Sequence, residues 1–306
     1  MSFAHRIKSE ICSNRPFRQR RQRAMACGLL SFGGRFDRDA ISIHTEHRKV
    51  ARLYADSITD LVGISGSITV QEIRRGDRRS IFAVKVDSSA DRAAVLLAFG
   101  RDADLEVWPV PDSPDEIPAF LSGAFLACGG ISDPEKSYHL EFATQRKELC
   151  ALLEQLLAGQ IAAPKATVRR NDYLLYYKES EQIEDLLTLI GAPRSALELM
   201  EVKIVKDLRN KVNRATNCET ANITRTVNTA VEQIEDIRLI ERSGGIGMLP
   251  EELQELARLR LSGADLSLRQ LGEQLSPPIS RSGVNHRLKR ISEFAENLRA
   301  KGPQTE

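Results

Sequence analysis

The chain has few of the features that mark a membrane-spanning, secreted or metal-dependent protein. No apolar run approaches the roughly 20 residues needed to cross a bilayer, and the first ten residues alternate charged with apolar side chains, unlike a secretory signal. The five cysteines include no Cys-x-x-Cys pair and have no histidine cluster beside them, which argues against a disulfide framework and a structural zinc site. We therefore expect a cytoplasmic, nucleoid-associated protein with no cofactor.

The chain also has little overall charge of one sign, because its formal net charge is +2. The charge is nevertheless segregated: residues 1–100 hold 18 basic and 10 acidic side chains, residues 101–200 hold 9 and 17, and residues 201–306 hold 17 and 15. This distribution fits a protein that offers local basic patches to phosphate without being basic as a whole. The length of 306 residues predicts two or more domains.

The first two thirds of the chain contain an internal duplication. Residues 27–36 (CGLLSFGGRF) and 122–131 (SGAFLACGGI) share a six-residue interval between glycines, Gly28 to Gly34 and Gly123 to Gly129. After each segment the pattern predicts a loop, a short strand, a helix, a hairpin and a helix that ends at a glycine. The expected strands are 41–45, 67–74 and 80–86 in the first copy and 138–142, 166–170 and 173–177 in the second.

The unit α-β-α-β-β-α therefore occurs twice, at about 18–100 and 116–191, and the two copies should pack as a pseudo-dimer. A glycine inside a helix costs about 1 kcal/mol relative to alanine and needs a reason. Gly28 and Gly123 would allow the two helices to approach backbone to backbone. The alternative is that these glycines only cap or loosen their helices.

These segments resemble degenerate LAGLIDADG motifs of homing endonucleases. Residues 123–142 (GAFLACGGISDPEKSYHLEF) and 217–223 (NCETANI) closely resemble the WhiA family of bacterial sporulation and cell-division regulators, and the resemblance covers essentially the whole chain. It implies an α+β fold, with a duplicated LAGLIDADG homing-endonuclease-like α/β domain followed by an all-α helix-turn-helix domain. It also implies control of genes for sporulation septation or cell division.

The resemblance implies no DNA cleavage. In the active nucleases, the residue before the last glycine of each motif is an acid, and the two acids hold divalent metal between the scissile phosphates. The matching positions here are Gly33 and Cys128, and neither can hold magnesium. Asp37 and Asp133 should lie in loops outside the helix pair, and His44 and His47 should point to opposite faces of a strand end. We expect no metal site and no enzymatic activity.

Two basic clusters of the duplicated domain are candidate anion contacts. One is the tip of the first hairpin, which would contact phosphate oxygens or keep an edge strand soluble. The other opens the first duplicated helix, where the helix dipole does not favour cations, and suggests an external anion or an acidic partner. The clusters are Arg74, Arg75, Arg78 and Arg79 at the tip, and Arg15, Arg18, Arg20, Arg21 and Arg23 at the helix.

Residues 195–242 are helical in pattern and are expected to form a connector. The polar segment 214–222 predicts a helix pair that docks one domain on another, or a nucleic-acid contact through Asn217 and Asn222. Residues 243–247 (SGGIG) break the pattern and predict a flexible boundary. The expected domains are therefore 1–192, a helical connector 193–243, and a helix-turn-helix domain 247–302.

The C-terminal segment predicts three helices. The first covers 250–261 and starts at a proline, and the second covers 267–275. Pro277 and Pro278 prevent its continuation, and Ser280 then caps a third helix that runs to about residue 300. Residues 279–291 (ISRSGVNHRLKRI) resemble the helix-turn-helix of the WhiA family, which is itself similar to a sigma-factor promoter-reading domain.

The third helix should bury one stripe, formed by Val284, Leu288, Ile291 and Ala295. The other faces suit DNA, because arginine binds guanine and asparagine binds adenine bidentately, each worth about 1–3 kcal/mol of discrimination. The predicted DNA-binding residues are Ser280, Arg281, Ser282, Asn285, His286, Arg287, Lys289 and Arg290, together with Arg269 of the second helix and the four hairpin arginines.

The sequence thus predicts a transcription regulator whose partner is double-stranded promoter DNA. RNA polymerase or a co-regulator protein is a further candidate partner, and no membrane partner is expected. Two other hypotheses stay open at this point. One is a nuclease with an unrecognised metal site, and the other is a nucleoid- or division-associated interaction protein in which DNA binding is incidental.

Overall fold

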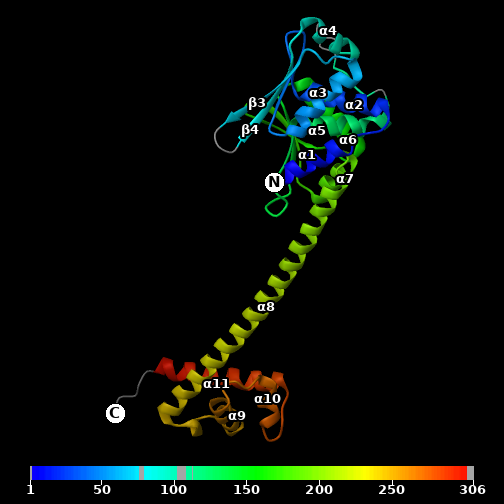
Figure 1. Ribbon diagram of the computed structural model, residues 1–306. Helices are drawn as coiled ribbons and strands as arrows, with labels where there is room; N and C mark the ends of the chain where they lie inside the picture. Colours follow the sequence, from blue (N-terminus) through cyan, green and yellow to red (C-terminus); the bar gives the residue numbers. More distant parts are fainter. Residues whose placement is uncertain (1, 76–78, 102–107, 112, 302–306) are drawn as a thin grey trace. The chain divides into compact units, whose positions relative to one another are not determined.

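The computed structural model describes residues 2–75, 79–101, 108–111 and 113–301 (Figure 1). The chain divides into two compact units, Met1–Asp207 and Leu208–Glu306. Unit 1 is mixed α and β, and unit 2 is helical in its described part. None of the helices in the described ranges combines the length and apolarity needed to span a membrane.

Unit 1 contains the repeated fold that the sequence predicts. After α1 (Phe3–Ser13), the first copy consists of α2 (Gln19–Phe32), β1 (Gly34–Phe36), β2 (Ile41–Thr45), α3 (Arg48–Val62), β3 (Ile68–Arg75), β4 (Arg79–Val86) and α4 (Ser89–Ala98). The second consists of η1 (Pro114–Glu116), α5 (Ile117–Cys128), β5 (Gly129–Ile131), β6 (Leu140–Thr144), α6 (Lys147–Gln160), β7 (Lys165–Arg169), β8 (Asp172–Tyr177) and α7 (Ser180–Leu189).

Each copy holds one four-stranded antiparallel sheet, in the order β1-β2-β4-β3 or β5-β6-β8-β7. Gly34 pairs with Ile43 and Gly129 with Phe142, so the two glycines occupy equivalent positions. Strands β1 and β5 are an addition to the prediction, which has a loop at both places. Three residues that include glycine are too short to show the alternation by which strands are recognised.

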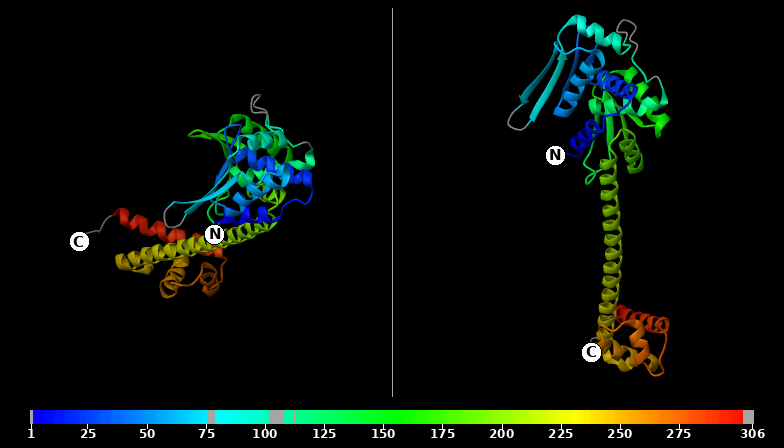
Figure 2. Two further views of the ribbon diagram at one scale, coloured as in Figure 1. Left: turned by 45° about the horizontal axis from the view of Figure 1, so that its top comes forward. Right: turned by 45° about the vertical axis from the view of Figure 1, so that its right-hand side comes forward.

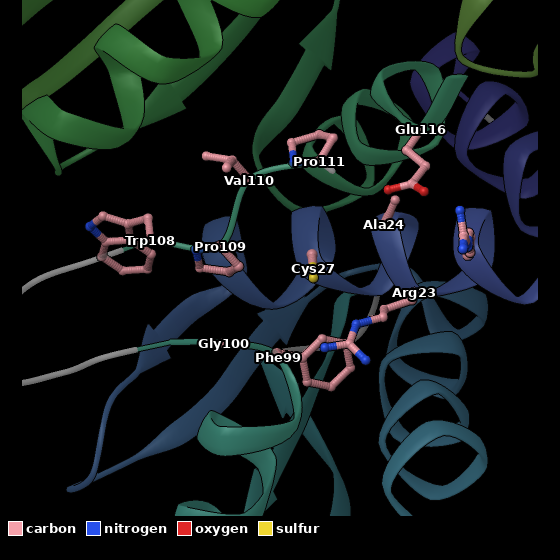
Figure 3. A pocket seen from close by; sticks show the side chains of 11 residues that line it. Arg23, Ala24, Cys27, Phe99, Gly100, Trp108, Pro109, Val110, Pro111 and Glu116 are labelled. Carbon is pink, nitrogen blue, oxygen red and sulfur yellow. The ribbon is translucent and has the colours of Figure 1, made fainter. Parts of the chain in front are cut away.

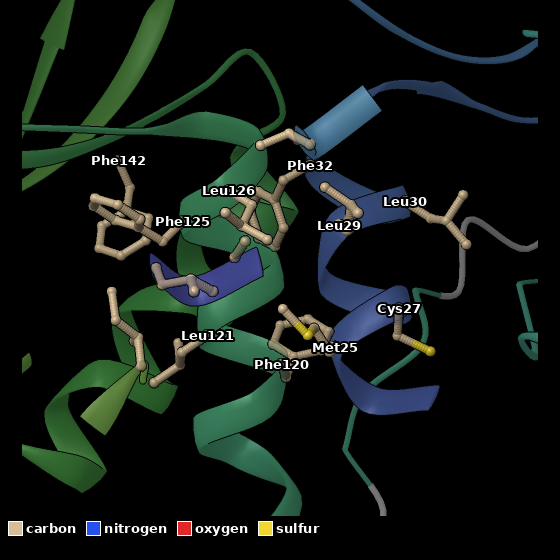
Figure 4. Packing of buried hydrophobic residues seen from close by; sticks show 14 of the residues in the cluster. Met25, Cys27, Leu29, Leu30, Phe32, Phe120, Leu121, Phe125, Leu126 and Phe142 are labelled. Carbon is tan, nitrogen blue, oxygen red and sulfur yellow. The ribbon is translucent and has the colours of Figure 1, made fainter. Parts of the chain in front are cut away.

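Helices α2 and α5 lie side by side at the centre of unit 1 (Figure 4). A Cβ atom added at Gly28 would lie 2.1 Å from the carbonyl oxygen of Phe120, and one at Gly123 would lie 2.0 Å from that of Met25. Both distances are shorter than any real contact, so the glycines are required by the close approach of the two backbones. The expectation of a glycine-mediated interface between the copies is confirmed.

Helix α1 packs against α3 and α5, and its side chains Phe3, Ile7 and Ile11 are buried. Lys8 is also buried and donates a hydrogen bond of 3.1 Å to the carbonyl oxygen of Leu126. His47, the residue before α3, also contacts α1, because its Nδ1 atom lies 3.0 Å from Nδ1 of His5.

Burial, together with the nearby charges of Lys8 and His5, lowers the pKa of His47 to about 4. Because this folded-state pKa lies below the ordinary value of about 6.5, folding favours the neutral ring. The stabilisation is complete above pH about 6.5 and is lost as the pH falls toward 4, by up to about 1.4 kcal/mol per pH unit.

We therefore expect the melting temperature of unit 1 to fall between pH 6.5 and 4.5, and to fall less in His47→Asn. The matched control is His44→Asn, because His44 is exposed. Thermal unfolding across this pH range checks the prediction, and equal pH dependence in all three proteins would contradict it.

Helix α8 (Pro193–Gly244) is one uninterrupted helix of 52 residues (Figures 1 and 2). The predicted helix pair around 214–222 is therefore wrong. The segment contains no glycine or proline, and its asparagines and threonines lower helix propensity by only a few tenths of a kcal/mol each. Polar composition alone does not end a helix.

Unit 2 packs η2 (Ile246–Met248), α9 (Glu251–Ser262), α10 (Leu268–Gln274) and α11 (Arg281–Lys301) against the end of α8. Ile237 and Ile240 of α8 are fully buried in this core together with Leu256, Leu271 and Leu288. The core thus reaches upstream of the glycine-rich segment 243–247, at which the sequence placed a domain boundary. A fragment that began at residue 247 would lack two core side chains.

Candidate nucleic-acid interface

The turn between α10 and α11 has a fixed geometry. A Cβ atom at Gly272 would lie 2.3 Å from the carbonyl oxygen of Ile279, and the Ile279 amide donates to the Gly272 carbonyl oxygen at 3.0 Å. Ser267 forms a capping box with Gln270 at the start of α10. The Ser280 hydroxyl accepts from the Gly283 amide at 3.2 Å and so caps α11, as the sequence predicts. These contacts set the position of α11 on the rest of unit 2.

Helix α11 buries the stripe that the sequence predicts. Val284, Leu288, Ile291 and Ala295 are all at most 1% exposed. The predicted site residues Ser280, Arg281, Ser282, Asn285, His286 and Lys289 are all exposed. The first turns of α11 thus bring together hydroxyl, amide, imidazole and cationic side chains on a surface that is open to solvent.

Arg287 and Arg290 lie differently, because both reach toward Glu252 in the first turn of α9. Arg290 Nη1 lies 2.5 Å from Glu252 Oε1, and Arg287 Nη1 donates to the Glu252 carbonyl oxygen at 3.2 Å. The hydrogen bond from Arg290 and the charge of the same side chain lower the pKa of Glu252. The sequence predicts Arg287 and Arg290 as site residues but not Glu252. This acid lies 38 positions from Arg290 in sequence, so no local pattern connects the two.

Two further predicted DNA-binding residues, Arg269 and Lys289, each pair with an acid four positions later on the same helix. Arg269 Nε lies 3.0 Å from Glu273 Oε1, and Lys289 Nζ lies 3.8 Å from Glu293 Oε1. All four side chains are more than half exposed, so the pairs contribute roughly 0.3–0.5 kcal/mol each. Pairs this weak leave both cations available to an external anion.

The hairpin arginines belong to the other unit. Arg74 is exposed on β3, whereas Arg75 and Arg79 are described only as the strand ends that pair with each other. Arg78 lies outside the described residues. The hairpin set thus lies on unit 1 and the α11 set on unit 2.

Gly33 and Cys128, the two positions matched to the acids of active nucleases, lie at the ends of the central helix pair. Gly33 follows the last residue of α2, and Cys128 ends α5, where burial raises the pKa of its thiol to about 12. Asp37 is taken up by Arg35 at 3.1 Å and by the amides of Asp39 and Ala40. Within the described ranges, no three histidine, cysteine or acidic side chains are placed to share a metal ion.

Arg20 and Arg23, near the start of α2, line a cavity of about 280 Å³ (Figure 3). Arg23 donates to the carbonyl oxygen of Ala98 and lies over the Phe99 ring, and Trp108 to Pro111 form another wall. Arg15 pairs with Asp56 at 3.1 Å. Groups of the protein itself therefore pair with two arginines of this cluster, Arg15 and Arg23. Arg18, Arg20 and Arg21 are exposed.

Comparison with known proteins gives consistent matches over both units. Residues 117–209 match the WhiA LAGLIDADG-like domain, and residues 212–295 match the WhiA C-terminal HTH domain. The chain is 40% identical to the "Probable cell division protein WhiA" of Clostridium perfringens strain 13, over 98% of this chain and 99% of that protein. It is 38% identical to the protein of the same name from Clostridium botulinum strain Hall, over 98% and 99%.

Among solved structures, the full-length DUF199/WhiA from Thermatoga maritima is similar, with a TM-score of 0.57 and 28% identity. The similarity covers 97% of this chain and 99% of that one. The matches to the two Clostridium proteins and to the solved structure extend across α8, so they include both the repeated α/β unit and the helical unit.

Proposed function

Because this chain belongs to the WhiA family, we propose that it is a sequence-specific DNA-binding transcription regulator that acts on genes of cell division and sporulation. The observation that carries the proposal is the outward face of α11, on which Arg281, Ser282, Asn285, His286 and Lys289 stand exposed on a firmly positioned helix. A helix of this kind fits the major groove of B-DNA, where its first turns face the base edges.

The neighbouring side chains suit the DNA backbone. Arg287 and Arg290 point along the side of α11 that meets α9, where they would follow one strand of phosphates. Lys289 on the outward face of α11 and Arg269 on α10 are further exposed cations. Base contacts near the start of the helix and phosphate contacts beside it are the usual division of labour in a helix-turn-helix.

The other parts of the proposal follow from this one. Promoter DNA is the partner, RNA polymerase or a co-regulator protein is a second partner, and the protein resides in the cytoplasm on the nucleoid. Chromatin immunoprecipitation of the full-length chain tests the regulator against an interaction protein that meets DNA incidentally. Sharp peaks at promoters are expected, and a uniform distribution would sink the proposal.

We also propose that the repeated unit does not cut DNA, because Gly33 and the protonated thiol of the half-buried Cys128 supply no carboxylate to a metal ion. Supercoiled plasmid that carries a bound promoter should stay intact when incubated with the protein and magnesium or manganese. Nicking that increases with protein concentration would revive the nuclease hypothesis.

Glu252 is expected to govern how strongly unit 2 binds DNA of arbitrary sequence. Its carboxylate neutralises Arg290, so Glu252→Gln should release this cation and raise affinity for random duplex about three- to tenfold, with a steeper salt dependence. Specific affinity should rise less, so the ratio of specific to random affinity falls. Titration of both duplexes at several salt concentrations measures the effect.

A suitable control is Glu251→Gln, the neighbouring exposed acid of the same helix turn. Glu251→Gln should leave the ratio within about twofold of the original. If the two variants behaved alike, Glu252 would have no special relation to Arg290.

A further inference from the structure

A cavity of about 590 Å³ lies between the two copies of unit 1. The first copy contributes the end of α2 and parts of β1 and β2, and the second contributes the residues between β6 and α6 and the start of β8. Gly33, Gly34 and Ala143 face it without long side chains, which leaves room for a ligand. The function proposed for unit 2 makes no use of this cavity.

The cavity is lined by two arginines, Arg35 from the first copy and Arg146 from the second. Arg146 Nη1 donates across the copies to the carbonyl oxygen of Ser31 at 3.3 Å, and its guanidinium lies 4.8 Å from the Trp108 ring centroid. Arg101 lies 4.0 Å from the same ring. Burial and the nearby charges of Arg101 and Arg35 lower the pKa of Arg146, and Asp37 opposes them. A cation that is half-buried among other cations is stabilised by an anion.

Other polar groups at the cavity also suit an anion. Arg146 is the N-cap of α6, and no side chain in the described ranges caps the backbone amides of this helix start, whose first turn also holds Glu148. The Ser31 hydroxyl is fully buried and has no hydrogen-bond partner among the described residues. The described residues that line the cavity include one acid, Asp172. Arg35 Nη2 lies 3.1 Å from a carboxylate oxygen of Asp37 and of Asp39. Because these acids offset part of the positive charge, the site would hold one anionic group rather than several.

We propose that this cavity binds a phosphate group through Arg146 and Arg35 at the start of α6. Guanidinium groups match the geometry of phosphate oxygens, and a helix start supplies backbone amides to the same group. The phosphate belongs either to a small free molecule or to a DNA backbone. In both cases the site needs no metal ion.

The first experiment follows thermal unfolding of the full chain and isothermal titration with inorganic phosphate, against sodium chloride at equal ionic strength. Phosphate should raise the melting temperature, and Arg146→Met should weaken phosphate binding about tenfold or more. Arg52→Met is the matched control, because Arg52 is an exposed arginine of α3. Arg35→Met, at a more exposed arginine, provides a second variant in case Arg146→Met does not fold.

The second experiment identifies the source of the phosphate, using a duplex of random sequence. If inorganic phosphate has no effect but Arg146→Met lowers the slope of log affinity against log salt by about one, the ligand is a DNA phosphate. If Arg146→Met and Arg35→Met both match Arg52→Met in both experiments, the site does not exist. Asn285→Ala, at α11, should leave phosphate binding unchanged, so failure of this site and failure of the regulator proposal remain distinguishable.

Discussion

Gly123→Ala is expected to destabilise unit 1 more than any other single methyl group added to the chain. The new Cβ would lie 2.0 Å from the Met25 carbonyl oxygen and 2.7 Å from the Leu29 amide nitrogen, and both atoms belong to the backbone of α2. Backbone atoms cannot rotate away as a side chain can, so the two helices must separate. Overpacking in a core costs about 1–3 kcal/mol, and the absence of any soft neighbour puts this case at the upper end or above.

Separation of α2 from α5 disturbs the centre of both copies, since Phe32, Phe120 and Leu29 pack there. The measurement is the free energy of unfolding of unit 1 by denaturant, followed by circular dichroism. The control is Gly159→Ala, because in α6 the added carbon would meet no described atom within 4 Å apart from its chain neighbours and the backbone of its own helix turn. That variant should gain stability from the higher helix propensity of alanine.

The opposite ranking would contradict the packing described for the helix pair. If Gly123→Ala unfolded at the same denaturant concentration as Gly159→Ala, the backbones of α2 and α5 would have to lie farther apart. Gly28→Ala offers an independent repeat, with its Cβ 2.1 Å from the Phe120 carbonyl oxygen.

Asn285→Ala is expected to lower the affinity for a selected promoter duplex about 10- to 100-fold. Its amide is exposed on the outward face of α11, one turn beyond the Ser280 cap, where it can pair with an adenine edge. Loss of one bidentate base contact costs about 1–3 kcal/mol. Affinity for random duplex should change little, because the amide carries no charge.

The chain offers a matched control on the same helix. Asn297 is also an exposed asparagine, about three turns farther along α11, and Asn297→Ala should leave both affinities unchanged. Arg75→Ala, at the hairpin of unit 1, should also weaken specific binding far less than Asn285→Ala. Equal losses in Asn285→Ala and Arg75→Ala would mean that the hairpin shares the reading of sequence.

Much of this fold was predictable because its signals are local. The equal glycine intervals at Gly28 and Gly123 revealed the repeat, and their close approach to a facing backbone explains why alanine does not replace them. The same holds for α11, where Pro277 and Pro278 end one helix and Ser280 begins the next. Each signal depends on the conformational limits of a single residue type.

The features that sequence reasoning missed depend on distant partners. The sequence of α1 places charged residues between Phe3, Ile7 and Ile11, and this apolar face is buried only because the distant helices α3 and α5 pack against it. Glu252 holds Arg290 across 38 positions. The prediction of a helix pair around 214–222 was wrong for another reason. Exposed polar residues are compatible with a continuous helix when the segment contains no glycine or proline.

The assignment of predicted site residues was likewise uneven. Patterning at the 3.6-residue period separated the buried stripe of α11 from its outward face, and the structure places both as expected. Periodicity could not divide the outward set further. The contact of Arg287 and Arg290 with α9 distinguishes them from Asn285 and His286, and this distinction needs three-dimensional packing.

The account depends on α11 reading the sequence of a DNA duplex. The most direct measurement selects duplexes from a random pool with the full chain, then compares the dissociation constants for the selected and a scrambled duplex at one salt concentration. A regulator of this kind should prefer the selected duplex by about a thousandfold or more, and Asn285→Ala should reduce that preference. A ratio near one would contradict the account.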